Sequence, residues 1–256
     1  MASIKVMTYN LRVDNTGDGI NSFTNRRERV LSMLREQQPD IIGFQECTHL
    51  MRACLEQHMP AYVFVGCGRE RDCTGESMAI AYRRDAFVLV SVDNFWLTAT
   101  PRVPGSNLGG DQSGCPRMAT VAVLRRHGAQ SEICMCNTHL DHQGPVARQI
   151  EAALLCAMLD AYKQPIILTG DMNAKPHKPE IGIIKAAMEA RGARDVTADL
   201  GGTFHDLGRK DPEKYSKIDY IFASGTCTEC YVIPDNKDGQ GLYYSDHFAI
   251  MAEIEI

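Results

Sequence analysis

Apolar residues recur along the chain in two patterns, and each pattern predicts a type of secondary structure. Continuous or alternating apolar runs predict strands, whereas apolar positions three and four apart predict helices. Val30, Leu31 and Leu34, for example, form one face of a predicted helix that Pro39 ends. The predicted strands cover residues 4–10, 41–44, 62–65, 78–82, 87–97, 119–124, 133–138, 165–170, 218–222, 228–233 and 248–256, and the predicted helices cover residues 25–38, 49–58, 146–162 and 181–190.

The order of these elements predicts an α/β fold. Strands are many, helices are few and the two do not alternate strictly, so we expect two packed sheets with helices outside. Residues 99–116 are rich in Pro and Gly and predict a long loop inside a domain, because strand-like segments lie on both sides. With 256 residues and no internal repeat, the chain is predicted to form a single domain over 1–256.

The composition is that of a soluble globular protein, with 44% hydrophobic and 23% charged residues. No stretch approaches the roughly 20 apolar residues that span a bilayer. The first residues alternate between apolar and polar and lack the shape of a signal peptide. We therefore expect a cytoplasmic protein without a membrane segment or an obligate protein partner, although a chain whose leader had been removed would look the same.

The charge argues weakly against long nucleic acid as the partner. Proteins that bind duplexes usually carry a basic face, because neutralising phosphates supplies most of their non-specific affinity. This chain has a net charge of −5 and only short basic clusters such as Arg26-Arg27 and Arg125-Arg126. A local basic groove is not excluded.

The ten cysteines predict reduced thiols in preference to disulfides or a zinc site. Cys134, Cys136 and Cys156 lie in apolar runs, where cysteine acts as a small buried hydrophobe. Cys227 and Cys230 form a lone CxxC motif without the second pair that a zinc finger requires.

Polar residues that can bind metal or move protons repeatedly lie next to predicted strands. Strand ends are rigid, so side chains placed there can converge accurately. Oxygen ligands from Asn, Asp and Glu suit a hard cation such as Mg²⁺. The six segments are Tyr9-Asn10, Gln45-Glu46, Asn137-Thr138-His139, Asp171-Met172-Asn173, Ile218-Asp219-Tyr220 and Ser245-Asp246-His247.

Each segment alone also has a purely structural explanation. Asn10 could cap a strand end, Asp171 could form a local turn, and His139 and His247 could be core histidines with satisfied hydrogen bonds. Asp219 is harder to explain in this way, because a carboxylate between apolar neighbours needs a partner. The ordered set of six favours a functional site.

This ordered series resembles the endonuclease/exonuclease/phosphatase superfamily, which includes deoxyribonuclease I, apurinic-site nucleases, sphingomyelinases, inositol polyphosphate 5-phosphatases and deadenylases. The resemblance runs from residue 4 to the C-terminus. It implies a four-layer α/β/β/α sandwich of two packed mixed sheets, with the site at one edge. Segments 76–83, 115–117 and 148–149 are similar to those of small bacterial members near the deadenylase branch.

The resemblance also implies a metal site and an activated water molecule. Glu46 would be the principal ligand of Mg²⁺ or Mn²⁺, with Asn10 beside it, and Asp246 would bind the metal directly or through water. Asp171 would deprotonate the attacking water, and Asn173 would hold the same water or a phosphate oxygen.

Further residues would contact the phosphate. His247 would contact the scissile phosphate, kept charged and oriented by Asp219, and His139 would donate to a non-bridging oxygen. Because negative charge develops on the oxygens, such donors and a cation supply much of the rate. The residues expected to line the phosphate pocket are Tyr82, Arg117 and Arg148; a surface position was the alternative for Arg117.

One residue departs from the family's pattern. Arg12 stands where several nucleases of the family have a second acidic residue, two positions after the Asn. A positive charge there weakens the case for two metals and predicts a cationic group near the mouth of the pocket.

Three functions are compatible with these motifs. The first expectation is water attack on a phosphodiester of nucleic acid or an oligonucleotide, which is frequent in the family. The alternative is a phosphatase or phosphodiesterase for a small soluble nucleotide, sugar or inositol phosphate, which the acidic charge and compact length favour slightly. An inactive binding module is a remote third, because all six motifs are present.

Overall fold

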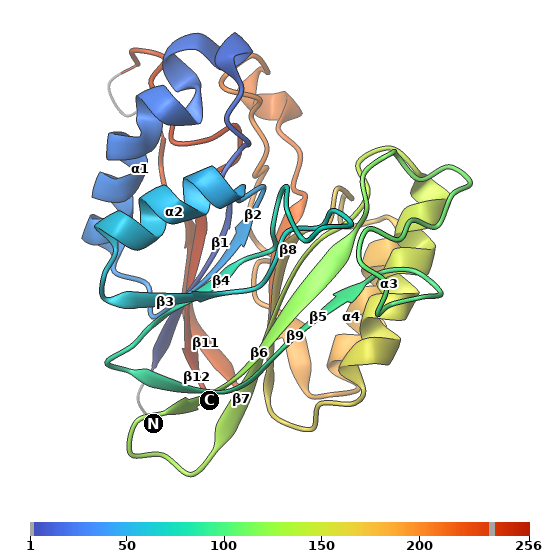
Figure 1. Cartoon of the computed structure of the whole chain (residues 1–256). Coiled ribbons are helices and arrows are strands. Elements are labelled where there is room, and N and C mark those ends of the chain that lie inside the picture. Colours follow the sequence, from blue (N-terminus) through green and yellow to red (C-terminus); the bar gives the residue numbers. More distant parts are fainter. Residues whose placement is uncertain (1–2, 236–238) are drawn as a thin grey trace.

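The computed structural model describes residues 3–235 and 239–256. Met1 and Ala2, which belong to the start predicted to lack a signal peptide, lie outside the described residues. Two six-stranded sheets pack together, with helices on their outer faces (Figure 1). The first sheet consists of β1 (Ile4–Asn10), β2 (Ile41–Gln45), β3 (Tyr62–Val65), β4 (Ile80–Arg83), β11 (Thr226–Val232) and β12 (Ile250–Glu255), in the order β11-β12-β1-β2-β4-β3.

The second sheet and the helices complete the sandwich. The sheet consists of β5 (Phe87–Trp96), β6 (Met118–Arg126), β7 (Glu132–His139), β8 (Ile166–Asp171), β9 (Ala193–Asp195) and β10 (Asp219–Ser224), in the order β5-β6-β7-β8-β10-β9. The helices are α1 (Phe23–Gln37), α2 (His49–His58), α3 (Pro145–Leu159) and α4 (Pro179–Glu189), with short 3₁₀ turns η1 (Thr16–Asn21) and η2 (Pro212–Lys214).

Three apolar clusters hold the layers together. The inner faces of the two sheets meet in a central core that includes Val6 and Ile221. The outer face of the first sheet packs against α1 and α2, where Leu31 and Phe44 belong to one cluster. A third cluster, including Leu155 of α3, joins the second sheet to α3 and α4. These layers confirm the predicted α/β/β/α sandwich.

Two parallel strand pairs explain why the motifs converge. β1 and β2 are parallel and connected through α1, so that Asn10 pairs with Gln45 at their C-terminal ends. β7 and β8 are parallel and connected through α3, so that His139 pairs with Asp171. β10 runs antiparallel to β8 and begins with Asp219 opposite Asp171. The functional segments therefore lie at one end of both sheets.

The two sheets approach each other closely just below that end. A Cβ atom on Gly43 would lie 2.1 Å from Thr169 Oγ1, so only glycine fits there without rearrangement. Gln45 Nε2 donates to Asn137 Oδ1 at 2.7 Å, and Asn137 Nδ2 donates to the backbone oxygen of Phe44 at 2.7 Å. This buried polar network ties the second sheet to the first under the site.

The element boundaries follow the predictions closely. The helix at 49–58 and the strand at 62–65 have the predicted bounds, and residues 99–116, all of them described, form neither helix nor strand. The sequence did not predict η1, β9 or η2, each too short to carry a periodic pattern. Among the described helices, none combines the length and apolar character needed to cross a bilayer.

Candidate active site

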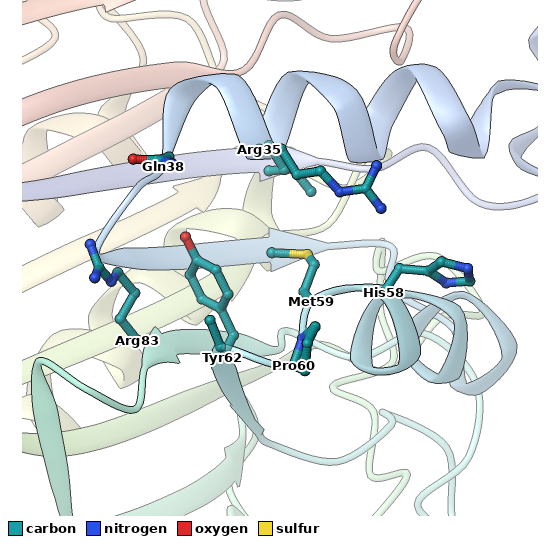
Figure 2. A pocket seen from close by; sticks show the side chains of 9 residues that line it. Arg35, Gln38, His58, Met59, Pro60, Tyr62 and Arg83 are labelled. Carbon is teal, nitrogen blue, oxygen red and sulfur yellow. The ribbon is translucent and has the colours of Figure 1, made fainter.

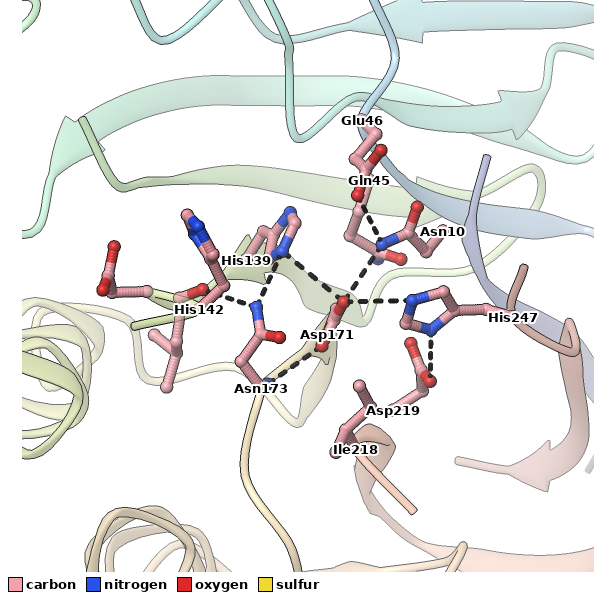
Figure 3. Close-up of polar contacts among 12 residues, drawn as sticks. Asn10, Gln45, Glu46, His139, His142, Asp171, Asn173, Ile218, Asp219 and His247 are labelled. Atoms are coloured by element: carbon pink, nitrogen blue, oxygen red, sulfur yellow. Dashed lines mark hydrogen bonds and ion pairs between the residues drawn. The ribbon is translucent and has the colours of Figure 1, made fainter. Parts of the chain in front are cut away.

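A cavity of about 340 Å³ opens where the strand ends meet. Figure 3 shows Asp171 near its centre, between His139 and His247, with Asn10 close by. The structure thus brings segments from both sheets to one place. Of the residues predicted for the site, those that line the cavity are Glu46, Arg117, His139, Asp171, Asn173, Asp246 and His247.

Glu46 and Asn10 lie together, as the predicted metal site requires. The two carboxylate oxygens of Glu46 accept hydrogen bonds from Asn10 Nδ2 at 3.1 Å and from the backbone nitrogen of Val13 at 2.7 Å. Asn10 Oδ1 accepts the backbone N–H of Arg12 at 2.9 Å, so the amide nitrogen of Asn10 faces the carboxylate. The guanidinium Nε of Arg12 lies 3.7 Å from Asp246 Oδ2. A cationic side chain therefore stands at the predicted metal site.

The chemistry of these donors fits a divalent cation. Glu46 and Asp246 face the same cavity, and burial together with the charge on Glu46 raises the pKa of Asp246. Neighbouring carboxylates repel each other unless a cation offsets their charge. Mg²⁺ and Mn²⁺ bind carboxylate and amide oxygens. The ligands that fit such an ion are Glu46 and Asp246, with Asn10 beside them.

A second cluster, formed by Asp171, Asp219 and His247, brings its polar atoms within 4.8 Å of one another. His247 Nδ1 lies 2.9 Å from Asp219 Oδ2, and its Nε2 lies 3.7 Å from Asp171 Oδ2. Burial opposes protonation, but the charges on Asp219 and Asp171 outweigh it and raise the pKa of His247 to about 10. A protonated imidazole donates hydrogen bonds to anions, so this cluster is suited to stabilising negative charge.

The carboxylate of Asp171 is fixed by two hydrogen bonds. Its Oδ1 accepts a hydrogen bond from the backbone N–H of Asn173 at 2.9 Å, and its Oδ2 accepts one from Asn10 Nδ2 at 3.0 Å. Burial and the charge on Asp219 raise the pKa of Asp171 to about 7. A carboxylate with a pKa near neutrality is suited to act as a general base.

His139 is neutral, and its tautomer follows from its neighbours. Burial and the charges on Arg117 and Arg69 keep the pKa of His139 well below its usual value. Asn173 Nδ2 is oriented by the backbone oxygen of Leu140 and also contacts His139 Nε2 at 3.0 Å. Nε2 therefore accepts that hydrogen bond, and the proton resides on Nδ1, which is buried and has no hydrogen-bond partner among the described residues.

The structure places two of the three residues predicted for the phosphate pocket elsewhere. Tyr82 lies in the central core between the sheets, in the same cluster as Ile80 two positions earlier on β4. Arg148 is held on α3 by an ion pair of 2.8 Å with Glu180 and donates to the backbone oxygen of Asp141. Neither lines the cavity, whereas Arg117 does, and it is 3% exposed.

Other residues of the cavity wall were not predicted as site residues. Arg69 and Phe204 come from loops without a recognisable motif. Glu76 belongs to segment 76–83, whose sequence indicated only a similarity to small bacterial members of the family. His142 lies three residues after His139, close enough in sequence that the motif could have been extended to include it.

Arg26, part of a basic cluster in the sequence, is fully buried. Its Nη2 donates to the backbone oxygens of Leu11 at 2.5 Å and Arg12 at 2.6 Å, and its Nη1 donates to that of Tyr244 at 2.7 Å. One side chain thereby joins the loop after Asn10, which lines the cavity, to the loop before Ser245.

A second hollow, of about 300 Å³, lies away from these residues (Figure 2). It is lined by the C-terminal ends of α1 and α2 and by β3. Arg35 and Arg83 both line it, and Arg83 is paired with Asp85 at 2.6 Å and lies 3.8 Å from Asp40. Tyr62 donates to the backbone oxygen of Pro39. Because the lining residues include no converging acid–base set, this hollow is not the candidate active site.

A buried glutamate that contacts the backbone of Asp141 leads to a prediction about stability. Glu151 Oε2 accepts the backbone N–H of Asp141 at 2.8 Å, while Oε1 has no partner. Burial raises the pKa of Glu151 from 4.5 to about 7. Stability from this group is therefore fully present below pH 4.5 and is lost as the pH rises through about 7.

We expect Glu151→Gln to increase the free energy of unfolding at pH 8 and to change it little at pH 4.5, because glutamine stays neutral. The shift corresponds to about 3 kcal/mol at most, at roughly 1.4 kcal/mol for each pH unit. Urea unfolding at both pH values measures the difference. Glu189→Gln, at an exposed position on α4, is the control, and the same effect at both pH values would contradict the prediction.

Comparison with known proteins identifies the family to which the chain belongs. The model of the endonuclease/exonuclease/phosphatase family matches residues 7–247. A crystal structure of an endonuclease/exonuclease/phosphatase from Bacteroides vulgatus is 28% identical, has a TM-score of 0.91 and is matched over 100% of both chains. The mannosyl-6-phosphatase of Bacteroides thetaiotaomicron is 28% identical, with a TM-score of 0.83, over 99% of this chain and 100% of that one.

Nocturnin of Drosophila melanogaster is 23% identical over 282 residues, which cover 92% of this chain and 42% of Nocturnin. The matched region spans 42% to 60% of the length of the curated relatives. The family match covers nearly the whole chain and includes all six polar segments that converge at the cavity. The chain therefore belongs to the endonuclease/exonuclease/phosphatase family.

Proposed function

We propose that the protein hydrolyses a phosphoester by attack of water, with Mg²⁺ or Mn²⁺ held by Glu46 and Asp246 beside Asn10. The observation that carries this proposal is the position of Asp171. Its carboxylate lies between neutral His139 and protonated His247, at the wall of a cavity that also contains the carboxylates of the metal site. A base and phosphate-binding donors thus face one space.

The side chains divide the chemistry among them. Asp171 accepts a proton from the attacking water, and Asn173 orients the Asp171 carboxylate through its backbone N–H. His247 donates Nε2–H to a phosphate oxygen, and Asp219 keeps the imidazole charged. His139 donates Nδ1–H to another oxygen. When bound, the divalent cation supplies further stabilisation of the negative charge on the phosphate.

A small soluble phosphoester is the substrate class that the site supports best. The cavity of about 340 Å³ suits a small molecule, and the net charge of −5 does not favour long nucleic acid. One similar structure, 28% identical, is that of a mannosyl-6-phosphatase. The likeness to human Nocturnin and to TDP2 bound to single-stranded DNA, at 19% and 17% identity, concerns the fold alone.

A substrate panel tests this proposal. RNA, DNA, nucleotides, inositol phosphates and sugar phosphates are incubated with the protein and Mg²⁺, and released phosphate and shortened oligonucleotides are measured. We expect the protein to release phosphate from small phosphoesters, and we expect EDTA to abolish this release. Full activity after exhaustive dialysis against EDTA would refute the metal requirement, and inactivity on the whole panel would refute the function.

The metal site gives a separate prediction. We expect Glu46→Gln to weaken Mg²⁺ binding by about tenfold or more, because it removes the charge of the main ligand. The fold should persist, since Glu46 follows β2 and is only partly buried. Calorimetric titration measures the affinity, with Glu56→Gln on the surface of α2 as the control. If the variant binds Mg²⁺ as tightly as the parent, the ligand assignment is wrong.

A further inference from the structure

Arg117 lines the cavity and has one nitrogen without a hydrogen-bond partner. Its Nε lies 3.3 Å from Asp141 Oδ2, and its Nη2 contacts His142 Nδ1 at 2.8 Å. Because arginine only donates, His142 Nδ1 accepts this hydrogen bond and His142 carries its proton on Nε2. Nη1 of Arg117 is buried and has no partner among the described residues. The guanidinium is therefore held at two of its nitrogens and lacks an acceptor at the third.

Asp141 is shared between Arg117 and several other donors. Asp141 accepts hydrogen bonds from the backbone nitrogens of Ser113, Gln143 and Gly144 and from the hydroxyl of Ser113. Its ion pair with Arg117 leaves the Nη1 N–H groups of this guanidinium, which is 3% exposed, without an acceptor among the described residues, so these groups can still donate to an anion.

A second buried arginine faces the same cavity. Arg69 Nη2 donates to Glu76 Oε1 at 2.8 Å, which fixes one edge of the guanidinium. Its Nε is buried without a hydrogen-bond partner and lies 3.6 Å from Glu70 Oε1. Arg69 and Arg117 come from separate loops, yet both line the cavity that contains Asp171 and His247. We call these two side chains the arginine wall.

Phosphomonoesters and phosphodiesters differ in what they require from such a wall. A diester has two non-bridging oxygens and one negative charge, whereas a monoester has a third such oxygen and carries a charge of about −1.5 to −2 near pH 7. The metal site, His247 and His139 already offer partners for two oxygens. A buried guanidinium N–H without an acceptor is unfavourable unless a ligand supplies one.

We propose that Arg69 and Arg117 bind the third oxygen of a terminal phosphate, so that the site selects dianionic phosphomonoesters over phosphodiesters. This inference rests on the proposed phosphoester hydrolysis and narrows its substrate class. The esterifying group of a diester would occupy the place of the third oxygen and leave Arg117 Nη1 and Arg69 Nε without an acceptor. The protein then acts as a phosphatase and not as a nuclease.

Two esters with the same leaving group provide the test. p-Nitrophenyl phosphate is a monoester, and methyl p-nitrophenyl phosphate is the matching diester, differing by one methyl group and about one charge. kcat/KM for both is measured with Mg²⁺ at pH 7.5 in the parent protein and in Arg117→Gln and Arg69→Gln. Arg102→Gln is the control, since Arg102 is 59% exposed and pairs with Asp93 on β5.

We expect the parent to prefer the monoester and Arg117→Gln to lower the monoester-to-diester ratio of kcat/KM by about tenfold or more, the effect of a lost charged hydrogen bond. Arg69→Gln should also lower this ratio. If Arg117→Gln does not fold, the ratio measured for Arg69→Gln tests the inference. A parent that prefers the diester, or equal losses on both esters, overturns the inference. Hydrolysis of neither ester, and of nothing in the wider panel, contradicts the proposed function itself.

Discussion

Replacing Asp171 with Ala is expected to lower kcat by about 10²- to 10⁴-fold, the usual contribution of a general base. The reason is that Asp171 is the carboxylate that lies between His139 and His247 and is fixed by Asn173. Turnover is measured at saturating substrate and Mg²⁺. Asp85→Ala, which removes an exposed carboxylate in the turn between β4 and β5, should leave turnover unchanged.

The same variant separates catalysis from structural support. Burial and the charge on Asp219 make ionised Asp171 unfavourable in the folded protein. The melting temperature of Asp171→Ala, measured in EDTA, is therefore expected to stay the same or rise. A large loss of thermal stability with normal turnover in the remaining folded protein would show that Asp171 is structural, and the mechanism would be wrong.

Asp219 and His247 are expected to act as one unit, and a double-mutant cycle should show it. Asp219 Oδ2 contacts His247 Nδ1 at 2.9 Å and also accepts the hydroxyl of Thr203 at 2.5 Å. Without the carboxylate, His247 would lose the charge that it brings to the phosphate. Asp219→Asn should lower kcat by about 10²- to 10³-fold, and His247→Ala should do the same.

The combined variant, Asp219→Asn with His247→Ala, should be little worse than either single variant, because the first change already disables the shared step. Losses that multiply fully would show that the two residues act independently. If Asp219 only supports the loop of Thr203, then Asp219→Asn lowers the melting temperature and spares kcat. Both quantities are therefore measured on all three variants.

The convergence of the residues proposed as metal ligands and base was predictable because it depends on strand ends. Asn10, Glu46, His139 and Asp171 each lie at or next to the C-terminal end of a strand whose apolar run is visible in the sequence. Parallel pairing then brings those ends together without any information about individual contacts. The apolar runs in the sequence and the parallel pairing of the strands both place these residues at the same edge of the sheets.

The positions of Tyr82 and Arg148 depend on where their side chains point, and the resemblance to the family did not indicate this. On β4, Ile80 and Tyr82 share a face because strands have a period of two, so Tyr82 follows Ile80 into the core. The alternation of side chains between the two faces of β4 could have predicted that Tyr82 lies in the core. The partner of Arg148 is Glu180 on another helix, and no local pattern in the sequence predicts a pair between α3 and α4.

Arg26 shows the same limit more clearly. Its neighbour Arg27 is 53% exposed, and nothing in the sequence distinguishes the two arginines. The acceptors of Arg26 are backbone oxygens of two distant loops, which any residue type could supply. Contacts of this kind depend on the tertiary structure alone, and they position the site as much as its acidic residues do.

The strand β12 lies inside the first sheet, paired with β11 on one side and β1 on the other. β1 is synthesised well before β12, so the first sheet cannot be completed until β12 has been made. Ser245 donates to the backbone oxygen of Asn10, which links the segment before β12 to the end of β1 beside the cavity. We therefore expect the pairing of β1 with β12, two strands far apart in the sequence, to be a slow step in folding.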